Sequence, residues 1–305
     1  DITLLVGLLS VLAAILIALL ARPLNLNKNL YIKLYFVLFL ITAFCSLLFH
    51  LIPSTILGIL GSLSFFFIFA FILLHSSQVL GNRKTVIFFS ITILIGLFSE
   101  VLCVKYGWIF GQYHYNAPFF FGLVPFTIPF LWAVVIYTSY TITNLFLFGF
   151  GGEKPKRKDN LWYFVGLLVL ISSISGLIAV NLDMMVEPIT ASSPVPDWVW
   201  LLGGPYFGVP ISNFIGWFSV TLVAIFIFRF YEAFSSSSED FGTLNIPLNL
   251  YILIVYLFYF LNNAFKAFTL GKTEYILIGV TTMTPFILIG LLALVVNWKG
   301  CNNKF

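Results

Sequence analysis

The chain has 305 residues, of which 61% are hydrophobic, 19% aromatic and only 9% charged, and its mean hydropathy is +1.07. Soluble globular proteins carry roughly 25% charged residues, so this composition excludes a soluble protein and indicates an integral membrane protein. The net charge of +4 gives no indication of nucleic-acid binding, because Lys and Arg in membrane proteins mainly report orientation. The three cysteines, Cys45, Cys103 and Cys301, lack the spacing of a disulfide framework or a thiolate metal site.

Nine apolar stretches are long enough to cross ~30 Å of hydrocarbon. We interpret the first as a true span, because no small-residue cleavage site follows it. Two of the stretches are separated only by a very short turn near Pro53. If this turn does not divide them, the count is eight spans instead of nine. The stretches lack the period-two alternation of membrane strands, so we expect an all-α, polytopic helical bundle that forms a single domain over 1–305. In chain order the spans cover 2–21, 31–52, 55–74, 85–104, 123–149, 161–182, 208–231, 247–268 and 275–297.

The basic residues predict the orientation of these spans. With the N-terminus outside, 12 of the 15 Lys and Arg residues fall in inner segments, and only Lys105, Lys266 and Lys272 fall in outer ones. This asymmetry is the one that the positive-inside rule describes. We therefore expect a multi-pass protein of the cell membrane with a cytoplasmic C-terminus, a cytoplasmic basic loop at 151–160 and a flexible inner linker at 235–240.

Two unusual loops fall on the predicted outer face, at about 100–132 and 181–217. Each contains Gly-x-Tyr and then Val-Pro, with a tryptophan seven residues after the proline (Trp132 and Trp217). Each loop also follows a helix that is expected to end near a carboxylate, Glu100 or Asp183. A parallel internal repeat would explain the likeness, and an aromatic belt at the membrane interface is the structural alternative. If the elements are equivalent, Trp132 and Trp217 should flank one cavity.

Ionisable side chains within a span are costly and by default indicate a functional site. Glu100 lies about one turn, ~6 Å, before the end of its helix, and pairing with Lys105 is the alternative. Asp183 lies closer to its predicted helix end, where a solvated carboxylate is the alternative. His114 and Glu187, the latter just before a proline, could each serve either structure or function. The chain contains no motif of hydrolases, ATPases or dinucleotide-binding proteins, and we expect no metal site.

The two loops resemble the two signatures of the membrane-bound carotenoid hydratases. The first signature is Glu-x5-Tyr-Gly-x3-Gly-Gln-Tyr-x-Tyr, from Glu100 to Tyr115, followed by Gly-Leu-Val-Pro-x6-Trp. The second is LDMMVEP…WVW…GGPYFGVPISNFIGW, which runs from residue 182 to 217. The family pattern carries a basic residue where this chain has His114. The likeness is concentrated in the two loops, and the other spans match only as apolar helices.

The resemblance implies that water is added to the terminal double bond of an acyclic carotenoid, giving a tertiary alcohol, as in the conversion of bisanhydrobacterioruberin to bacterioruberin. The implied partners are a hydrophobic carotenoid and the lipid bilayer, with no nucleic acid, and association with other membrane enzymes of the pathway is a further expectation. Hydration needs a proton donor, one water and stabilisation of a tertiary cation, but no cofactor. Aromatic faces can stabilise a cation by ~0.5–2 kcal/mol each.

These requirements give each candidate residue an expected role. Glu100, the deeper acid, is expected to deliver the proton, because burial favours the neutral carboxylic acid. Asp183 is expected to take a proton from the attacking water, with Asn213 or His114 orienting that water. Substitution of Glu187 is expected to matter less than substitution of Asp183. The expected substrate-binding residues are Tyr106, Trp108, Tyr113, Tyr115, Tyr206, Trp217 and Glu187.

Two other functions remain open from the sequence. A carotenoid (lycopene-type) cyclase would use the same protonation but would capture the cation with a second double bond instead of water. A non-enzymatic protein that binds or transports carotenoids would tolerate changes in both loops without any change in pigment chemistry. A membrane prenyltransferase is disfavoured, because Asp183 has no second aspartate within four residues to help bind Mg²⁺-diphosphate.

Overall fold

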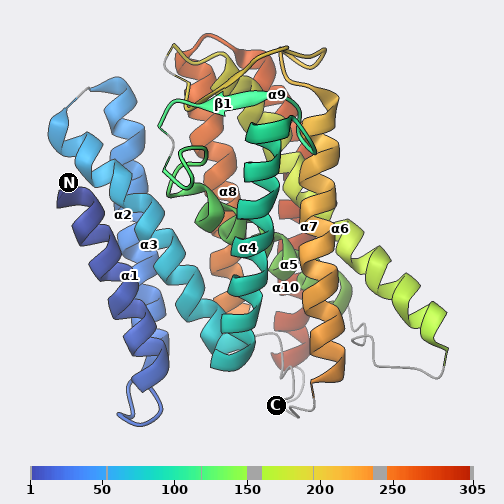
Figure 1. The fold of residues 1–305 in the computed structure, drawn as a ribbon. Helices are drawn as coiled ribbons and strands as arrows, with labels where there is room; N and C mark the ends of the chain where they lie inside the picture. The colour runs from blue at the N-terminus through green and yellow to red at the C-terminus, as the bar shows by residue number, and fades with distance from the viewer. Residues whose placement is uncertain are drawn as a thin grey trace. The chain divides into compact units, whose positions relative to one another are not determined.

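The protein is an all-α, polytopic membrane protein (Figure 1). The computed structural model describes residues 2–302 except for 53, 118, 150–159, 195 and 236–245. Within these residues, nine helical stretches are long and apolar enough to cross a membrane, as the sequence predicts. Helices suit lipid because they satisfy their backbone hydrogen bonds internally. The basic loop predicted at 151–160 and the linker predicted at 235–240 lie outside the described residues, apart from Asn160 and Ser235.

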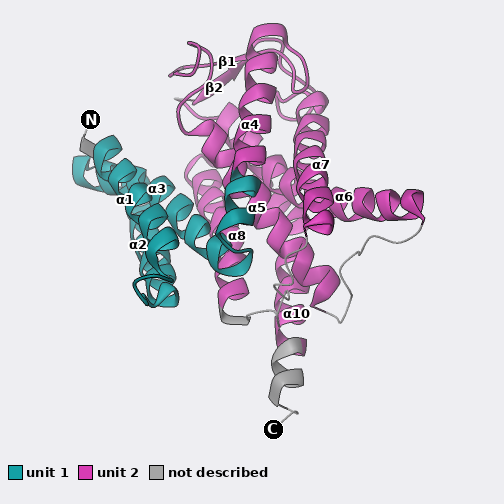
Figure 2. Ribbon diagram, turned by 60° about the horizontal axis from the view of Figure 1, so that its bottom comes forward, with its two compact units in different colours: residues 1–89 teal, residues 90–305 magenta. Residues whose placement is uncertain are grey.

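The chain divides into two compact units, residues 1–89 and 90–305 (Figure 2). Unit 1 is a helical unit in which α3 packs against both α1 and α2. The Tyr35 hydroxyl donates to the Ser10 carbonyl at 2.8 Å, which ties α2 to α1. The first unit consists of α1 (Ile2–Leu20), α2 (Lys28–Leu51), α3 (Thr55–Val79) and the first part of α4 (Asn82–Tyr106).

Unit 2 holds the rest of α4, the other six helices and two short strands, and α6 packs against four of those helices. The last span, Thr273–Val296, consists of two helices that meet at Met283. Pro285 follows this break, and its missing N–H cannot continue the helical ladder. The elements are β1 (Tyr113–Tyr115), α5 (Ile128–Phe148), α6 (Leu161–Ala191), β2 (Trp198–Trp200), α7 (Ile211–Phe234), α8 (Ile246–Thr269), α9 (Thr273–Thr282) and α10 (Thr284–Asn302).

Helix α6 is longer than the sequence predicts, since it continues through Pro188 to Ala191. Pro188 has no N–H to donate to the Met184 carbonyl, one helical turn earlier. The Tyr206 hydroxyl donates to that carbonyl at 3.0 Å instead, so the proline is accommodated. Asp183 is consequently 1% exposed and lies well inside the helix. The expectation that it sits near a solvated helix end is wrong.

The two loops meet in a two-stranded ribbon. Strands β1 and β2 pair antiparallel, with Tyr113 opposite Trp200, His114 opposite Val199 and Tyr115 opposite Trp198. Because side chains alternate along a strand, both tyrosines lie on one face and the central histidine on the other. The tyrosines are buried and the histidine is exposed. The ribbon therefore turns four aromatic side chains toward the helices of unit 2.

The side of the membrane that carries this ribbon stays a prediction, which cysteine labelling can test. In a background without the native cysteines, a cysteine at Ser192 should react with a membrane-impermeant maleimide in intact cells, because this position follows α6 at the end predicted to lie outside. A cysteine at Lys156 should react only after the membrane is opened. The reverse pattern would contradict the orientation that the basic residues predict.

Candidate functional site

Glu100 is held by the first loop and by α5. It is 5% exposed and accepts hydrogen bonds from three neutral donors. The hydroxyls of Tyr113 and Tyr115 donate to Oε2, the latter at 2.9 Å, and the Trp132 indole donates to Oε1 at 2.8 Å. Lys105, the alternative partner, lies over the ring of Tyr106 instead. Glu100 is thus a buried carboxyl group whose hydrogen bonds come from phenols and an indole.

The phenols that contact Glu100 remain neutral donors. Burial raises the pKa of Tyr113 and of Tyr115 well above the ordinary tyrosine value, and the nearby Glu100 charge raises both further. Both tyrosines lie on β1, outside the spans. Each hydroxyl therefore keeps its proton across the ordinary pH range and can still exchange it with a hydrogen-bonded partner.

Glu187 is held by the second loop in a similar way. It is 4% exposed, and a single oxygen, Oε2, accepts the indole N–H groups of both Trp198 and Trp200 at 3.1 Å each. Both tryptophans belong to β2, so each strand of the ribbon contacts one carboxyl group. Strand β1 contacts Glu100 on α4, and β2 contacts Glu187 on α6.

Asp183 lies one turn before Glu187 on the same face of α6, since residues four apart are neighbours on a helix. Its Oδ2 accepts the Asn213 amide at 2.7 Å, which leaves the amide oxygen of Asn213 for another partner. Asn213 lines the cavity described next, whereas Asp183 is not among the lining residues. The aspartate therefore acts on this cavity through the asparagine that it orients.

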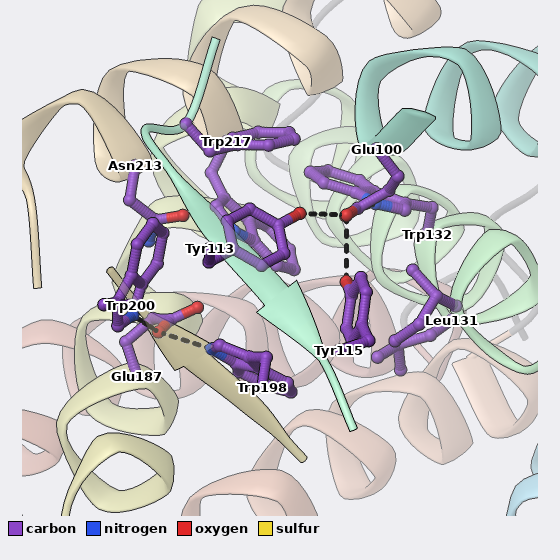
Figure 3. Close-up of a pocket in the computed structure, with 12 residues that line it drawn as sticks. Glu100, Tyr113, Tyr115, Leu131, Trp132, Glu187, Trp198, Trp200, Asn213 and Trp217 are labelled. Atoms are coloured by element: carbon purple, nitrogen blue, oxygen red, sulfur yellow. Dashed lines mark hydrogen bonds between the residues drawn. The ribbon is translucent and has the colours of Figure 1, made fainter. Parts of the chain in front are cut away.

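A cavity of about 40 Å³ lies among these groups (Figure 3). One water needs roughly 10–15 Å³, so the cavity has room for water. Glu100 and Glu187 both line it, and Figure 3 shows them at opposite ends of the lining group. The lining residues are Glu100, Phe110, Tyr113, Tyr115, Ile128, Leu131, Trp132, Glu187, Trp198, Trp200, Asn213 and Trp217. Seven of these twelve are aromatic, so ring faces dominate the walls.

The two Val-Pro-x6-Trp elements bring their tryptophans to one cavity. Trp132 and Trp217 both line the cavity, with ring centroids 4.1 Å apart. Gly96, one turn before Glu100 on α4, makes room for this arrangement. A Cβ at Gly96 would lie 2.7 Å from Trp132, so a larger residue would displace the indole that donates to Glu100. The prediction that these tryptophans flank one cavity is confirmed.

Five of the predicted site residues do not line the cavity, and Asp183, which reaches it only through Asn213, is one of them. The side chain of His114 is exposed on the outer face of β1. Tyr106 and Trp108 are 50% and 60% exposed and pack against each other at 5.1 Å. Tyr206 donates to the Met184 carbonyl. The other five lie outside the cavity, whereas the structure brings together Glu100, Tyr113, Tyr115, Glu187, Asn213 and Trp217.

Comparisons with known proteins identify the family of the chain. The family profile described as carotenoid biosynthesis protein matches residues 60–284, a range that contains both loops and all three buried carboxyl groups. The chain belongs to the carotenoid biosynthesis protein family. It is also 25% identical over 135 residues to a bisanhydrobacterioruberin hydratase of Haloarcula japonica, a match that covers 43% of this chain and 40% of that relative. No solved structure matches the chain.

Within this carotenoid biosynthesis protein, sequence reasoning missed several contributors to the site. Nothing in the sequence alone indicates Trp198, and the repeat points to Trp132 without indicating that it donates to Glu100. The alternating Trp-Val-Trp of β2 carries a strand signal, but three residues are too few to establish it. The strand can be recognised only when it is paired with Tyr-His-Tyr of β1, because this pairing turns the aromatic residues of both strands to one face.

A second buried polar cluster in the same unit was also missed. Arg229 of α7 is 3% exposed; it donates to Asn144 Oδ1 at 2.8 Å and lies 4.5 Å from the Tyr140 ring centroid. The Tyr140 hydroxyl donates to Glu232, with Oε2 at 3.2 Å. Sequence reasoning used Arg229 only as an inner positive charge. None of these four residues lines the cavity. Glu232 is therefore a carboxylate outside the cavity whose substitution can serve as a control.

The hydrogen bond from the Tyr206 hydroxyl to the Met184 carbonyl is expected to stabilise the folded protein. Tyr206→Phe should lower the free energy of unfolding by about 1 kcal/mol, because the Met184 carbonyl loses the donor that replaces the missing N–H of Pro188. Burial raises the pKa of Tyr206 to about 12, so the wild-type hydroxyl donates at all ordinary pH values. A thermal melt of the detergent-solubilised protein measures the effect. An unchanged melting temperature would show that this bond contributes nothing.

Proposed function

We propose that this protein hydrates the terminal double bond of an acyclic carotenoid by acid catalysis in the cavity between the two loops. The carrying observation is that two buried carboxyl groups, both bonded only to neutral donors among the described residues, line one aromatic cavity with room for water. Family membership supports the pathway, and the hydratase from Haloarcula japonica supports the reaction.

Glu100 supplies the proton in this proposal. When Glu100 is protonated on Oε2, it donates this proton to one of the two phenols that otherwise donate to it, and the O–H of that phenol is freed to point into the cavity. Its proton therefore reaches the substrate through a phenol. Glu100 gives its proton to the hydroxyl oxygen of Tyr113 or Tyr115 while that hydroxyl gives its own proton to the CH carbon of the terminal double bond. Electrons of the double bond form the new C–H bond, and the adjacent dimethyl-substituted carbon becomes a tertiary cation.

The cavity walls stabilise this cation before water captures it. The rings of Trp132 and Trp217 lie against each other, and Phe110 stacks on Trp132 at 5.8 Å. Each ring face near a cation contributes ~0.5–2 kcal/mol. Asn213, oriented by Asp183, and Glu187 supply polar atoms beside the cation, which favours water over a second double bond as the nucleophile. This is the feature that favours hydration over cyclisation.

An isoprenoid chain end is larger than the present cavity, so its access requires lining side chains to move. Side chains of the ribbon line the cavity, and hydrogen bonds to Glu100 and Glu187 join them to α4 and α6. Both carboxyl groups contact the ribbon and the cavity. Binding of the chain end and proton transfer therefore involve the same bonds.

The proposed reaction is tested by expressing the protein in a strain that accumulates an acyclic carotenoid. Chromatography and mass analysis of the pigments should show a gain of one or two waters, depending on whether one or both ends react. An unchanged mass with altered absorption would indicate cyclisation instead. Unaltered pigments bound to the purified protein would indicate a carotenoid-binding or transport function.

A further inference from the structure

We infer that Glu187, rather than Asp183, is the second catalytic carboxylate, which takes the proton from the attacking water. This inference rests on the proposed hydration. Asp183 is not among the cavity-lining residues, whereas Glu187 is. A base must reach the water whose proton it takes, so Glu187 is the acid residue of α6 that meets this requirement.

The hydrogen bonds of Glu187 divide its two oxygens between two tasks. An ionised carboxylate oxygen has about two lone-pair sites, and both sites of Oε2 are taken by the indoles of Trp198 and Trp200. In the described part of the chain, Oε1 has no hydrogen-bond partner. The indoles thus fix the carboxylate and compensate its charge, and Oε1 is left to accept a proton from water in the cavity.

Glu100 differs from Glu187 in this respect. Its Oε2 accepts two phenols and its Oε1 accepts an indole, so each of its oxygens already has a donor, whereas Glu187 Oε1 has none among the described residues. The two carboxyl groups are therefore suited to different steps. Glu100 exchanges protons with hydroxyl groups that touch the substrate, and Glu187 offers a bare oxygen to the nucleophile.

The water step is balanced by one proton transfer. The oxygen of water forms a bond to the tertiary cation, and one of its protons passes to Glu187 Oε1 as the alcohol forms. Glu187 then carries one proton more and Glu100 one fewer than at the start. Transfer of that proton through cavity water restores both groups, so turnover consumes only carotenoid and water.

Deuterium labelling separates the two steps. Wild-type protein in lipid vesicles with an unlabelled acyclic carotenoid in D₂O should give an alcohol with one carbon-bound deuterium per hydrated end. Glu187→Gln should lower hydration by about 100-fold or more, because the amide cannot take a proton from water. The recovered carotenoid should still gain carbon-bound deuterium, since Glu100 continues to form the cation, which then reverts by losing a proton.

Glu100→Gln is the matched comparison, and it should show neither hydration nor deuterium in the recovered carotenoid. A Glu187→Gln variant that hydrates at the wild-type rate would overturn the inference. So would a folded Glu187→Gln variant that loses the deuterium exchange as well, because it would place Glu187 in the first proton transfer. If the wild type itself forms neither the alcohol nor deuterated carotenoid, it is the proposed function that fails.

A second variant keeps the test valid if Glu187→Gln does not fold. Trp198→Phe combined with Trp200→Phe retains Glu187 and the ring faces but removes both donors to Oε2. This variant should lower hydration and keep the deuterium exchange, because only the orientation and charge compensation of Glu187 are lost. Unchanged hydration would contradict the role assigned to the indoles and to the carboxylate that they orient.

Discussion

Glu100→Gln should abolish hydration while the protein still folds and retains carotenoid. The amide keeps the shape of the side chain: its oxygen can take the place of Oε1 and accept from Trp132, and its NH₂ can then donate to the hydroxyl of Tyr115. It has no acidic proton to deliver, so formation of the tertiary cation stops. General acid catalysis is worth about 10²–10⁴-fold, and we expect a loss of at least this size in the rate of alcohol formation by the purified variant.

Glu232→Gln is the control for this exchange. Glu232 also accepts a tyrosine hydroxyl, that of Tyr140, but it does not line the cavity. This variant should hydrate at close to the wild-type rate once its folding has been checked. A Glu100→Gln variant with wild-type activity would show that the acid is another residue, and Glu187, the other carboxyl group that lines the cavity, would then be the first to test.

The Tyr113→Phe, Tyr115→Phe double variant should lose hydration by about 10²–10⁴-fold. Both phenols contact Glu100 and line the cavity, so either one can pass the proton to the substrate. Each single variant retains one relay and should therefore lose much less. Initial rates of alcohol formation by the three variants measure the difference.

The double variant keeps the ring faces and the buried volume of the ribbon. Loss of activity should therefore come with wild-type retention of carotenoid by the purified protein. Wild-type hydration by the double variant would mean that Glu100 reaches the substrate directly. A single variant as inactive as the pair would assign the whole relay to that tyrosine.

The spans and the candidate role of Glu100 could be predicted from sequence because each depends on local composition, although Asp183, at 1% exposed against 5%, is the more buried of the two acids. Nine apolar stretches are predicted and nine are found among the described residues, since hydropathy alone determines which segments can cross lipid. Glu100 could be identified because a carboxyl group within a span is costly. The likeness of the two loops predicted that Trp132 and Trp217 share a cavity, which the structure confirms.

The remainder of the site depends on contacts between distant residues. Pro188 indicates a helix end by local rules, and α6 continues only because Tyr206, far along the chain, fills the place of the missing N–H. The side to which His114 points depends on the pairing of two three-residue strands. Glu187 gains its partners from that same pairing, so nothing in the sequence ranks it above Asp183.

The origin of the product oxygen tests the central claim most directly. Purified protein in lipid vesicles is supplied with an acyclic carotenoid in water enriched in heavy oxygen, and the pigment is analysed by mass spectrometry. The account predicts one heavy oxygen per hydrated end with the wild type and none with Glu100→Gln. A product of unchanged mass, or an alcohol whose oxygen does not come from water, would contradict it.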